Sequence, residues 1–91
     1  MRISNIIGLN GKAIANQYIL THDNGDKYFQ SYDSIIAVKK ANGDILLDEK
    51  SWNFSSTTAK YRNVFLNETT KGTQKKIDAG IYKLANLNSE A

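Results

Sequence analysis

Three Asn-Gly dipeptides divide the first half of the chain, at residues 10–11, 24–25 and 42–43. A two-residue type I′ turn needs positive φ at both central positions, and Asn-Gly meets that need at low conformational cost. Asn24-Gly25 stands between residues 18–22 and 27–30, and both segments are rich in β-branched and aromatic residues. The same holds on either side of Asn42-Gly43. This pattern predicts two tight β-hairpins.

A further hairpin at Asn10-Gly11 would join residues 3–7 to residues 13–17. This signal is weaker, because Ala13-Ile14-Ala15 is also compatible with the start of a helical turn. A fourth turn is expected at residues 31–34, where Asp33 and Ser34 can bond nearby backbone amides. The first fifty residues therefore predict an antiparallel meander of four to five strands.

The pattern becomes helical after Lys50. Residues 55–58 are all Ser or Thr, and a hydroxyl at the cap position can accept from a first-turn amide of a helix over residues 59–66. Tyr61, Val64 and Phe65 have the spacing of one helix face, which we expect to lie on the sheet. The neighbouring polar side chains are then expected to lie in solvent: Lys60, Arg62 and Asn63.

A second short helix is expected to begin at Thr69 or Thr70 and to end before Gly80, which suits the left-handed position after a helix. Residues 81–84 can return as a final short strand. The prediction is therefore an α+β fold, an antiparallel β-meander followed by two short α-helices packed on the sheet. Since 91 residues leave no room for a second core, residues 1–91 form a single domain, with residues 88–91 frayed. The core is predicted to include Trp52, Phe54 and Phe65.

The residues that carry chemistry are sparse. Without cysteine the chain has no disulfide and no thiolate ligand, and its one histidine, His22, is expected on the surface at a hairpin corner. Asp44 and Asp48, four residues apart on one strand, suit either a weak oxygen-ligand site or solubilising charges at strand ends. No phosphate-binding loop or nucleophile elbow occurs. We therefore expect no enzyme activity, no catalytic residues, no metal and no cofactor.

Two further expectations concern location. The N-terminus has no hydrophobic region typical of a signal peptide. The longest aliphatic run, residues 35–38, is far shorter than the roughly 20 residues of a membrane helix. These features predict a soluble protein of the cytoplasm that does not bind membranes.

The net charge of +3 is unevenly distributed. Acidic and basic residues balance in the first fifty positions, so the whole excess lies in the C-terminal part. Such asymmetry is typical either of a solvated, lysine-rich helix face or of a surface for an anionic partner.

Two segments support a resemblance to known proteins. These are residues 28–37 (YFQSYDSIIA) and residues 47–66, in which the aromatic pair Trp52 and Phe54 precedes a Ser/Thr cap and a Lys-Tyr-Arg-Asn helix. Over residues 11–87 the chain resembles a family of small bacteriophage and prophage proteins of unknown function. The resemblance implies action inside a bacterial cell, and it implies no catalytic or binding residues.

From these observations the leading hypothesis is a small phage-encoded protein that inhibits or redirects a host macromolecular complex, for example an anti-CRISPR or another anti-defence factor. Exposed aromatic residues rimmed by basic ones would form the partner-binding surface: Tyr28, Tyr32, Tyr61, Lys60, Arg62, Lys75 and Lys76. The alternative is a nucleic-acid-binding accessory protein, with tyrosines stacking bases beside lysines of the sheet or with the basic C-terminal part on phosphates. A homodimer formed through an open edge strand is also compatible with the pattern.

Overall fold

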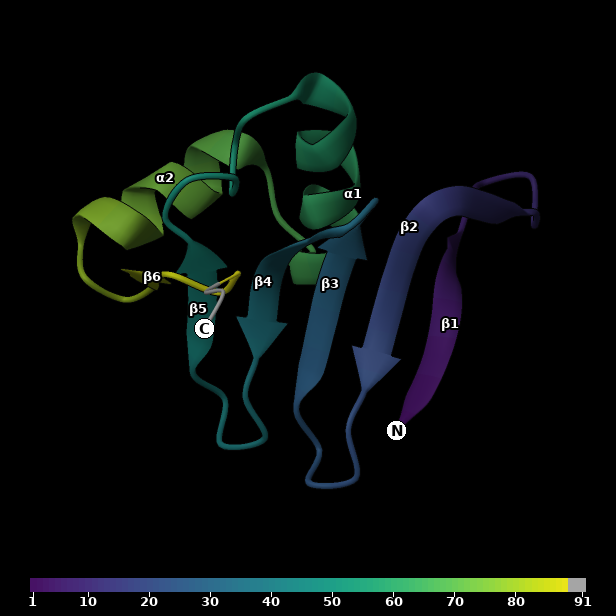
Figure 1. Cartoon of the computed structure of the whole chain (residues 1–91). Coiled ribbons are helices and arrows are strands. Elements are labelled where there is room, and N and C mark those ends of the chain that lie inside the picture. The colour runs from purple at the N-terminus through teal and green to yellow at the C-terminus, as the bar shows by residue number, and fades with distance from the viewer. Residues whose placement is uncertain (89–91) are drawn as a thin grey trace.

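The computed structural model, which describes residues 1–88, has one six-stranded sheet with two helices on one side (Figure 1). The strands lie in the sheet in the same order as in the chain. The elements in order are β1 (Arg2–Ile7), β2 (Ala13–Thr21), β3 (Lys27–Ser31), β4 (Ser34–Lys39), β5 (Ile45–Asp48), α1 (Ser56–Leu66), α2 (Thr70–Asp78) and β6 (Lys83–Ala85). The α+β prediction is thereby confirmed.

The sixth strand differs from the prediction of a purely antiparallel meander of four to five strands. Strands β1 to β5 pair antiparallel, but β6 pairs parallel to β5, with Leu84 opposite Leu47. The physical reason is the connection. Because α1 and α2 fill the segment between β5 and β6, the chain crosses over the sheet and returns in the same direction.

The hairpin loops contain three residues, so the predicted two-residue type I′ turns are wrong. Gly11, Gly25 and Gly43 have φ of 80°, 96° and 96°, whereas the asparagine before each glycine does not have positive φ. Each glycine amide donates to the carbonyl three residues earlier, as in Gly25 N to His22 O at 3.0 Å. Each three-residue loop is therefore a turn followed by a glycine in the left-handed conformation, which forms a β-bulge.

The asparagines explain why this loop forms. In each loop the Asn side-chain oxygen accepts from the amide two residues later, with N···O distances of 3.0 Å for Asn10, 3.0 Å for Asn24 and 2.9 Å for Asn42. The side chain thus stabilises the turn that precedes the glycine. The hairpins were predicted at the right places, but through a different backbone geometry.

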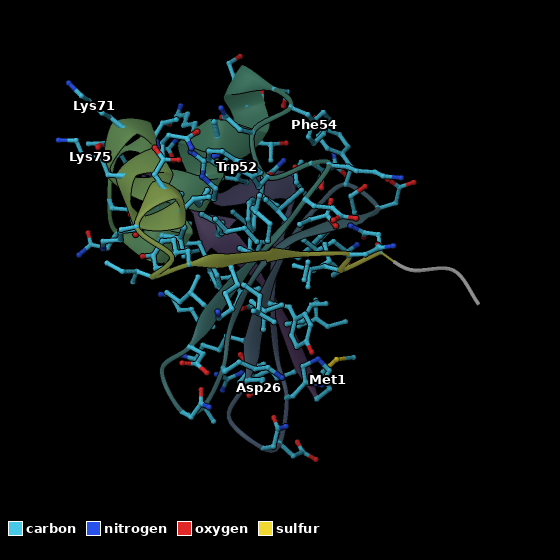
Figure 2. The ribbon with its side chains drawn as sticks, turned by 90° about the vertical axis from the view of Figure 1, so that its left-hand side faces the viewer. Met1, Asp26, Trp52, Phe54, Lys71 and Lys75 are labelled. Atoms are coloured by element: carbon cyan, nitrogen blue, oxygen red, sulfur yellow. The ribbon has the colours of Figure 1, made fainter. Side chains whose placement is uncertain are left out.

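The core lies between the sheet and the helices. Phe29, Ala37 and Leu47 are directly opposite one another on β3, β4 and β5 and are fully buried. Phe65 of α1 stacks on Phe29, with ring centroids 5.8 Å apart. Ile77 of α2 packs against the same cluster. Both helices therefore cover one face of the sheet, which Figure 2 shows from the side.

Two of the three predicted core aromatics lie in the core or against it. Phe65 is buried and Trp52 packs on the cluster as a partly buried side chain. Phe54 is 59% exposed, so its prediction is wrong. It lies in the turn before the helix cap Ser55, outside the helical register that points Phe65 inward.

The C-terminal segment is tied to the sheet. Asp48 at the end of β5 accepts from the Leu87 amide at 2.9 Å. Asn88 bonds both backbone groups of Ile35, donating to its carbonyl at 2.8 Å and accepting from its amide at 2.7 Å. Asn88, which we expected to fray, is therefore anchored, and residues 89–91 lie outside the described residues.

Candidate binding groove

The seven residues predicted to bind a partner do not gather on one surface. Lys60, Tyr61 and Arg62 belong to α1, and Lys75 and Lys76 belong to α2. Tyr28 is half-buried on β3, and Tyr32 is 56% exposed in the turn that joins β3 to β4. The structure brings only Lys60 and Tyr61 to a common cavity.

Arg62 was expected in solvent, and that prediction is wrong because its side chain is fully buried. Its guanidinium lies 4.9 Å from the Trp52 ring and donates to the Trp52 carbonyl. It also donates to Asn63 Oδ1 and Thr70 Oγ1, both at 2.9 Å. Burial lowers the pKa of Arg62, and nearby Glu68 opposes that shift. Arg62 thus joins α1 to the turn before it and to α2, and its buried side chain offers no surface to a partner.

Lys76 is also engaged within the fold. Its ammonium lies 3.6 Å from Glu68 Oε1 and 5.2 Å from the Tyr82 ring centroid. The Tyr82 hydroxyl donates to the same Glu68 oxygen. The hydrogen bond from Lys76 to Tyr82, together with the charge of Glu68, raises the pKa of Lys76. Lys75, by contrast, is exposed on α2 together with Lys71 (Figure 2).

Two lysines of the predicted stacking platform, Lys27 and Lys39, lie on the opposite face of the sheet from Tyr28. Successive strand residues point to opposite faces, so Tyr28 faces away from the helices while Lys27 and Phe29 face towards them. Lys39, opposite Lys27 on β4, lies with its ammonium 4.7 Å from the Phe65 ring centroid and therefore also faces α1. Tyr28 packs instead against His22, with ring centroids 4.7 Å apart.

An apolar groove lies between α1 and the β1–β2 hairpin. It comprises two neighbouring cavities of about 480 and 310 Å³ that share Ile6, Ile7 and Val64. Ile6 is buried, whereas Ile7 and Val64 are 59% and 57% exposed and Leu9 at the loop tip is fully exposed. Large apolar side chains that converge on a concave surface are typical of a binding site. We call this surface the α1–β1 groove.

Local backbone structure shapes this groove. The β1–β2 register shifts between Asn5 and Ile7, which lets the adjacent Ile6 and Ile7 both line it. Gly8 comes next in the chain, and its backbone lies close to the Ile14 side chain, since a Cβ at this position would lie 2.9 Å from Ile14 Cδ1. A shift of register cannot be predicted from strict alternation, which explains why the sequence did not identify Ile7. Val64 was predicted to face the sheet, but its side chain is largely exposed at the edge of the contact between α1 and the sheet.

The charged residues that line the groove are all lysines: Lys27, Lys39 and Lys60. Lys27 and Lys39 are directly opposite each other on β3 and β4. Burial lowers the pKa of Lys39 and the charge of Lys27 lowers it further, while the charge of Glu68 opposes the shift. Lys60 lies with its ammonium 5.3 Å from the Tyr61 ring centroid. The groove therefore combines an apolar floor with a positively charged rim.

Asp44 and Asp48, the two aspartates singled out in the sequence, both make hydrogen bonds within the fold. Asp48 is buried, and its Oδ2 accepts from the Ser51 amide at 2.9 Å and the Ser51 hydroxyl at 2.6 Å. Burial would raise the pKa of Asp48, but these bonds and the one from Leu87 outweigh it and lower the pKa. Asp44 is exposed and its amide bonds Asn42 in the hairpin loop. Of the two alternatives considered for Asp48, the solubilising surface charge is therefore wrong.

Over residues 1–88, no three His, Asp or Glu side chains lie close enough to hold a metal ion together. In the same part of the chain, neither helix combines the length and the apolar character needed to cross a bilayer.

Fold and groove together define a small α+β domain with an apolar, lysine-rimmed groove at one edge of its sheet. The chain belongs to a family of unknown function, DUF8033, whose model matches residues 1–80. The match ends before β6. Comparison with curated proteins found no match, and neither did comparison with solved structures.

Proposed function

We propose that this chain is a non-catalytic binding protein that engages a macromolecular complex through the α1–β1 groove and inhibits or redirects it. The observation that carries this proposal is the convergence of exposed apolar side chains, Ile7, Leu9 and Val64, on one concave surface. Leaving such side chains in water costs free energy that a partner would recover by covering them.

We further propose, on the resemblance to small phage proteins, that the complex belongs to a bacterial host and acts in defence or in transcription or replication. An anti-CRISPR or related anti-defence role fits a small chain with an apolar, lysine-rimmed binding surface. The protein would then act by occupying a surface that the host complex needs, in the host cytoplasm.

Affinity capture tests the proposal with a matched pair of variants. Val64→Asp places a charge in the groove, whereas Ile81→Asp places the same charge on a side chain that is 64% exposed beyond α2. We expect wild type and Ile81→Asp to capture the same host complex and Val64→Asp to lose it. Equal capture by all three proteins, or no specific capture in several hosts, would refute the proposal.

Nucleic-acid binding remains the alternative, supported by the exposed Lys71 and Lys75 on α2 (Figure 2). Its support is reduced because Arg62 is buried and Lys76 is paired with Glu68. Fluorescence anisotropy with labelled single- and double-stranded DNA and RNA at two salt concentrations tests it. Tight binding that weakens steeply with salt would favour this alternative, since phosphate contacts release counterions.

A further inference from the structure

We propose that the α1–β1 groove takes an acidic, amphipathic protein segment, whose apolar side chains enter the groove and whose carboxylates meet Lys27, Lys39 and Lys60. This inference rests on the proposed function and specifies the partner of the same site. It follows from three properties of the groove: the arrangement of its lysines, the kind of apolar side chain in its floor, and the repulsion that two copies of it would meet in a dimer.

The arrangement of the groove lysines favours a negatively charged partner. Lys27 and Lys39 are directly opposite across β3 and β4, a position in which like charges destabilise a sheet. Among residues 1–88, the lysines within salt-bridge distance of a carboxylate are Lys40 and Lys76. None of the groove lysines belongs to that group, and no Asp or Glu lines either cavity, although the charge of Glu68 acts on Lys39 from outside the groove. A carboxylate brought by the partner would offset the repulsion between Lys27 and Lys39.

The floor of the groove favours a peptide over a nucleic acid. The side chains shared by both cavities are aliphatic: Ile6, Ile7 and Val64. Proteins bind the bases of single strands mainly by stacking them on aromatic rings. The two aromatic residues that line the groove, Tyr61 and Phe65, are each covered by a lysine ammonium, at 5.3 and 4.7 Å from the ring centroids. Aliphatic side chains of a protein fit this floor better than bases.

A second copy of the chain is a poor occupant, although β1 is an outer strand of the sheet. A two-fold dimer places the same patch of both subunits face to face. Lysines around one groove would then meet the same lysines of the copy, and like charges across an interface cost affinity. An acidic segment avoids this cost.

Peptide display tests the inference. A library of random peptides on yeast is sorted for binding to the full-length protein and counter-sorted against the Val64→Asp variant. We expect the enriched peptides to carry Asp or Glu beside large apolar residues. If the groove-dependent peptides are neutral or basic, the inference fails while the proposed binding function survives. If no groove-dependent peptide is enriched, both fail.

Charge-reversal variants then test the lysines with one enriched peptide. Lys27→Glu and Lys60→Glu should each weaken binding roughly two- to five-fold, and added salt should weaken it in wild type. Lys75→Glu makes the same charge change on α2 and should leave the affinity unchanged. Thermal melts verify folding, and Lys60→Glu serves alone if Lys27→Glu melts early. Equal weakening by Lys75→Glu and Lys60→Glu would show a general charge effect and overturn the inference. Sedimentation that shows a dimer lost in Val64→Asp would assign the groove to a second copy instead.

Discussion

Replacing Arg62 by alanine should remove much of the stability of this domain. The guanidinium reaches four acceptors from three segments: the Trp52 carbonyl, Asn53 Oδ1, Asn63 Oδ1 and Thr70 Oγ1. Its side chain is fully buried, so Arg62→Ala removes a donor from each of these acceptors and opens a cavity, although Thr70 Oγ1 keeps the bond from Asn63 Nδ2. Leaving buried polar groups unsatisfied costs about 1–3 kcal/mol, and the cavity left by the side chain adds a cost of similar size. The expected loss is therefore about 3 kcal/mol, which is large against a total of roughly 5–15 kcal/mol.

Urea denaturation measures this loss through the fluorescence of Trp52, the one tryptophan in the chain, with far-ultraviolet circular dichroism as an independent probe. At a denaturant slope of about 1 kcal/mol/M, the midpoint should fall by about 3 M, or the protein should be unfolded in buffer. Arg62→Lys should recover little, since a compact ammonium cannot span the four acceptors. Lys60→Ala, exposed on the same helix, should stay within about 0.5 kcal/mol of wild type.

A loss below about 1 kcal/mol in Arg62→Ala would refute this reasoning. It would mean that water replaces the guanidinium and that Arg62 resembles an ordinary surface residue.

Three further predictions concern the loops and caps. Because bonds from Ser51 and Leu87 hold the pKa of Asp48 below its ordinary value of 3.8, the stabilisation that they give is present above that pH and lost as pH falls through the lower, folded value. Asp48→Asn has no carboxylate to protonate, so its melting temperature should fall less than that of wild type as the pH is lowered. The same fall in both proteins would contradict the assignment. Gly25→Ala should cost more than Gly43→Ala, since both glycines have φ of 96° but only the Cβ at Gly25 meets a neighbour, the Ala41 Cβ at 3.1 Å; equal melting temperatures would argue against it. Ser55→Ala should cost about 1 kcal/mol through loss of the cap to Thr58, whereas Ser56→Ala should cost far less, as measured by urea titration.

Much of the sheet could be predicted from local chemistry, because each Asn-Gly dipeptide stabilises its hairpin through contacts within a few residues. The cap at Ser55 is equally local. The parallel pairing of β6 could not be predicted, since Lys83–Ala85 is short and its position depends on the crossover through both helices.

The groove was only partly predictable. Lys60 and Tyr61 were both predicted to bind a partner and do line the groove, but Arg62 was predicted with them because charge normally indicates solvent. Its burial depends on acceptors from residues 52–53 and Thr70, which no helix pattern reveals. Ile7 was missed because the register shift after Asn5 breaks the alternation on which strand predictions rest.

The parallel strand β6 also has a consequence for the order of folding. The hairpins of β1 to β5 join neighbours in sequence, so their loops close at little entropic cost and can form as the chain leaves the ribosome. Pairing of β6 with β5 requires the whole intervening segment of α1 and α2, and it is then secured by Asp48 with Leu87 and by Asn88 with Ile35. We expect this closure to be a late kinetic event, so the β5 edge of the nascent sheet is exposed until the segment through Asn88 has been synthesised.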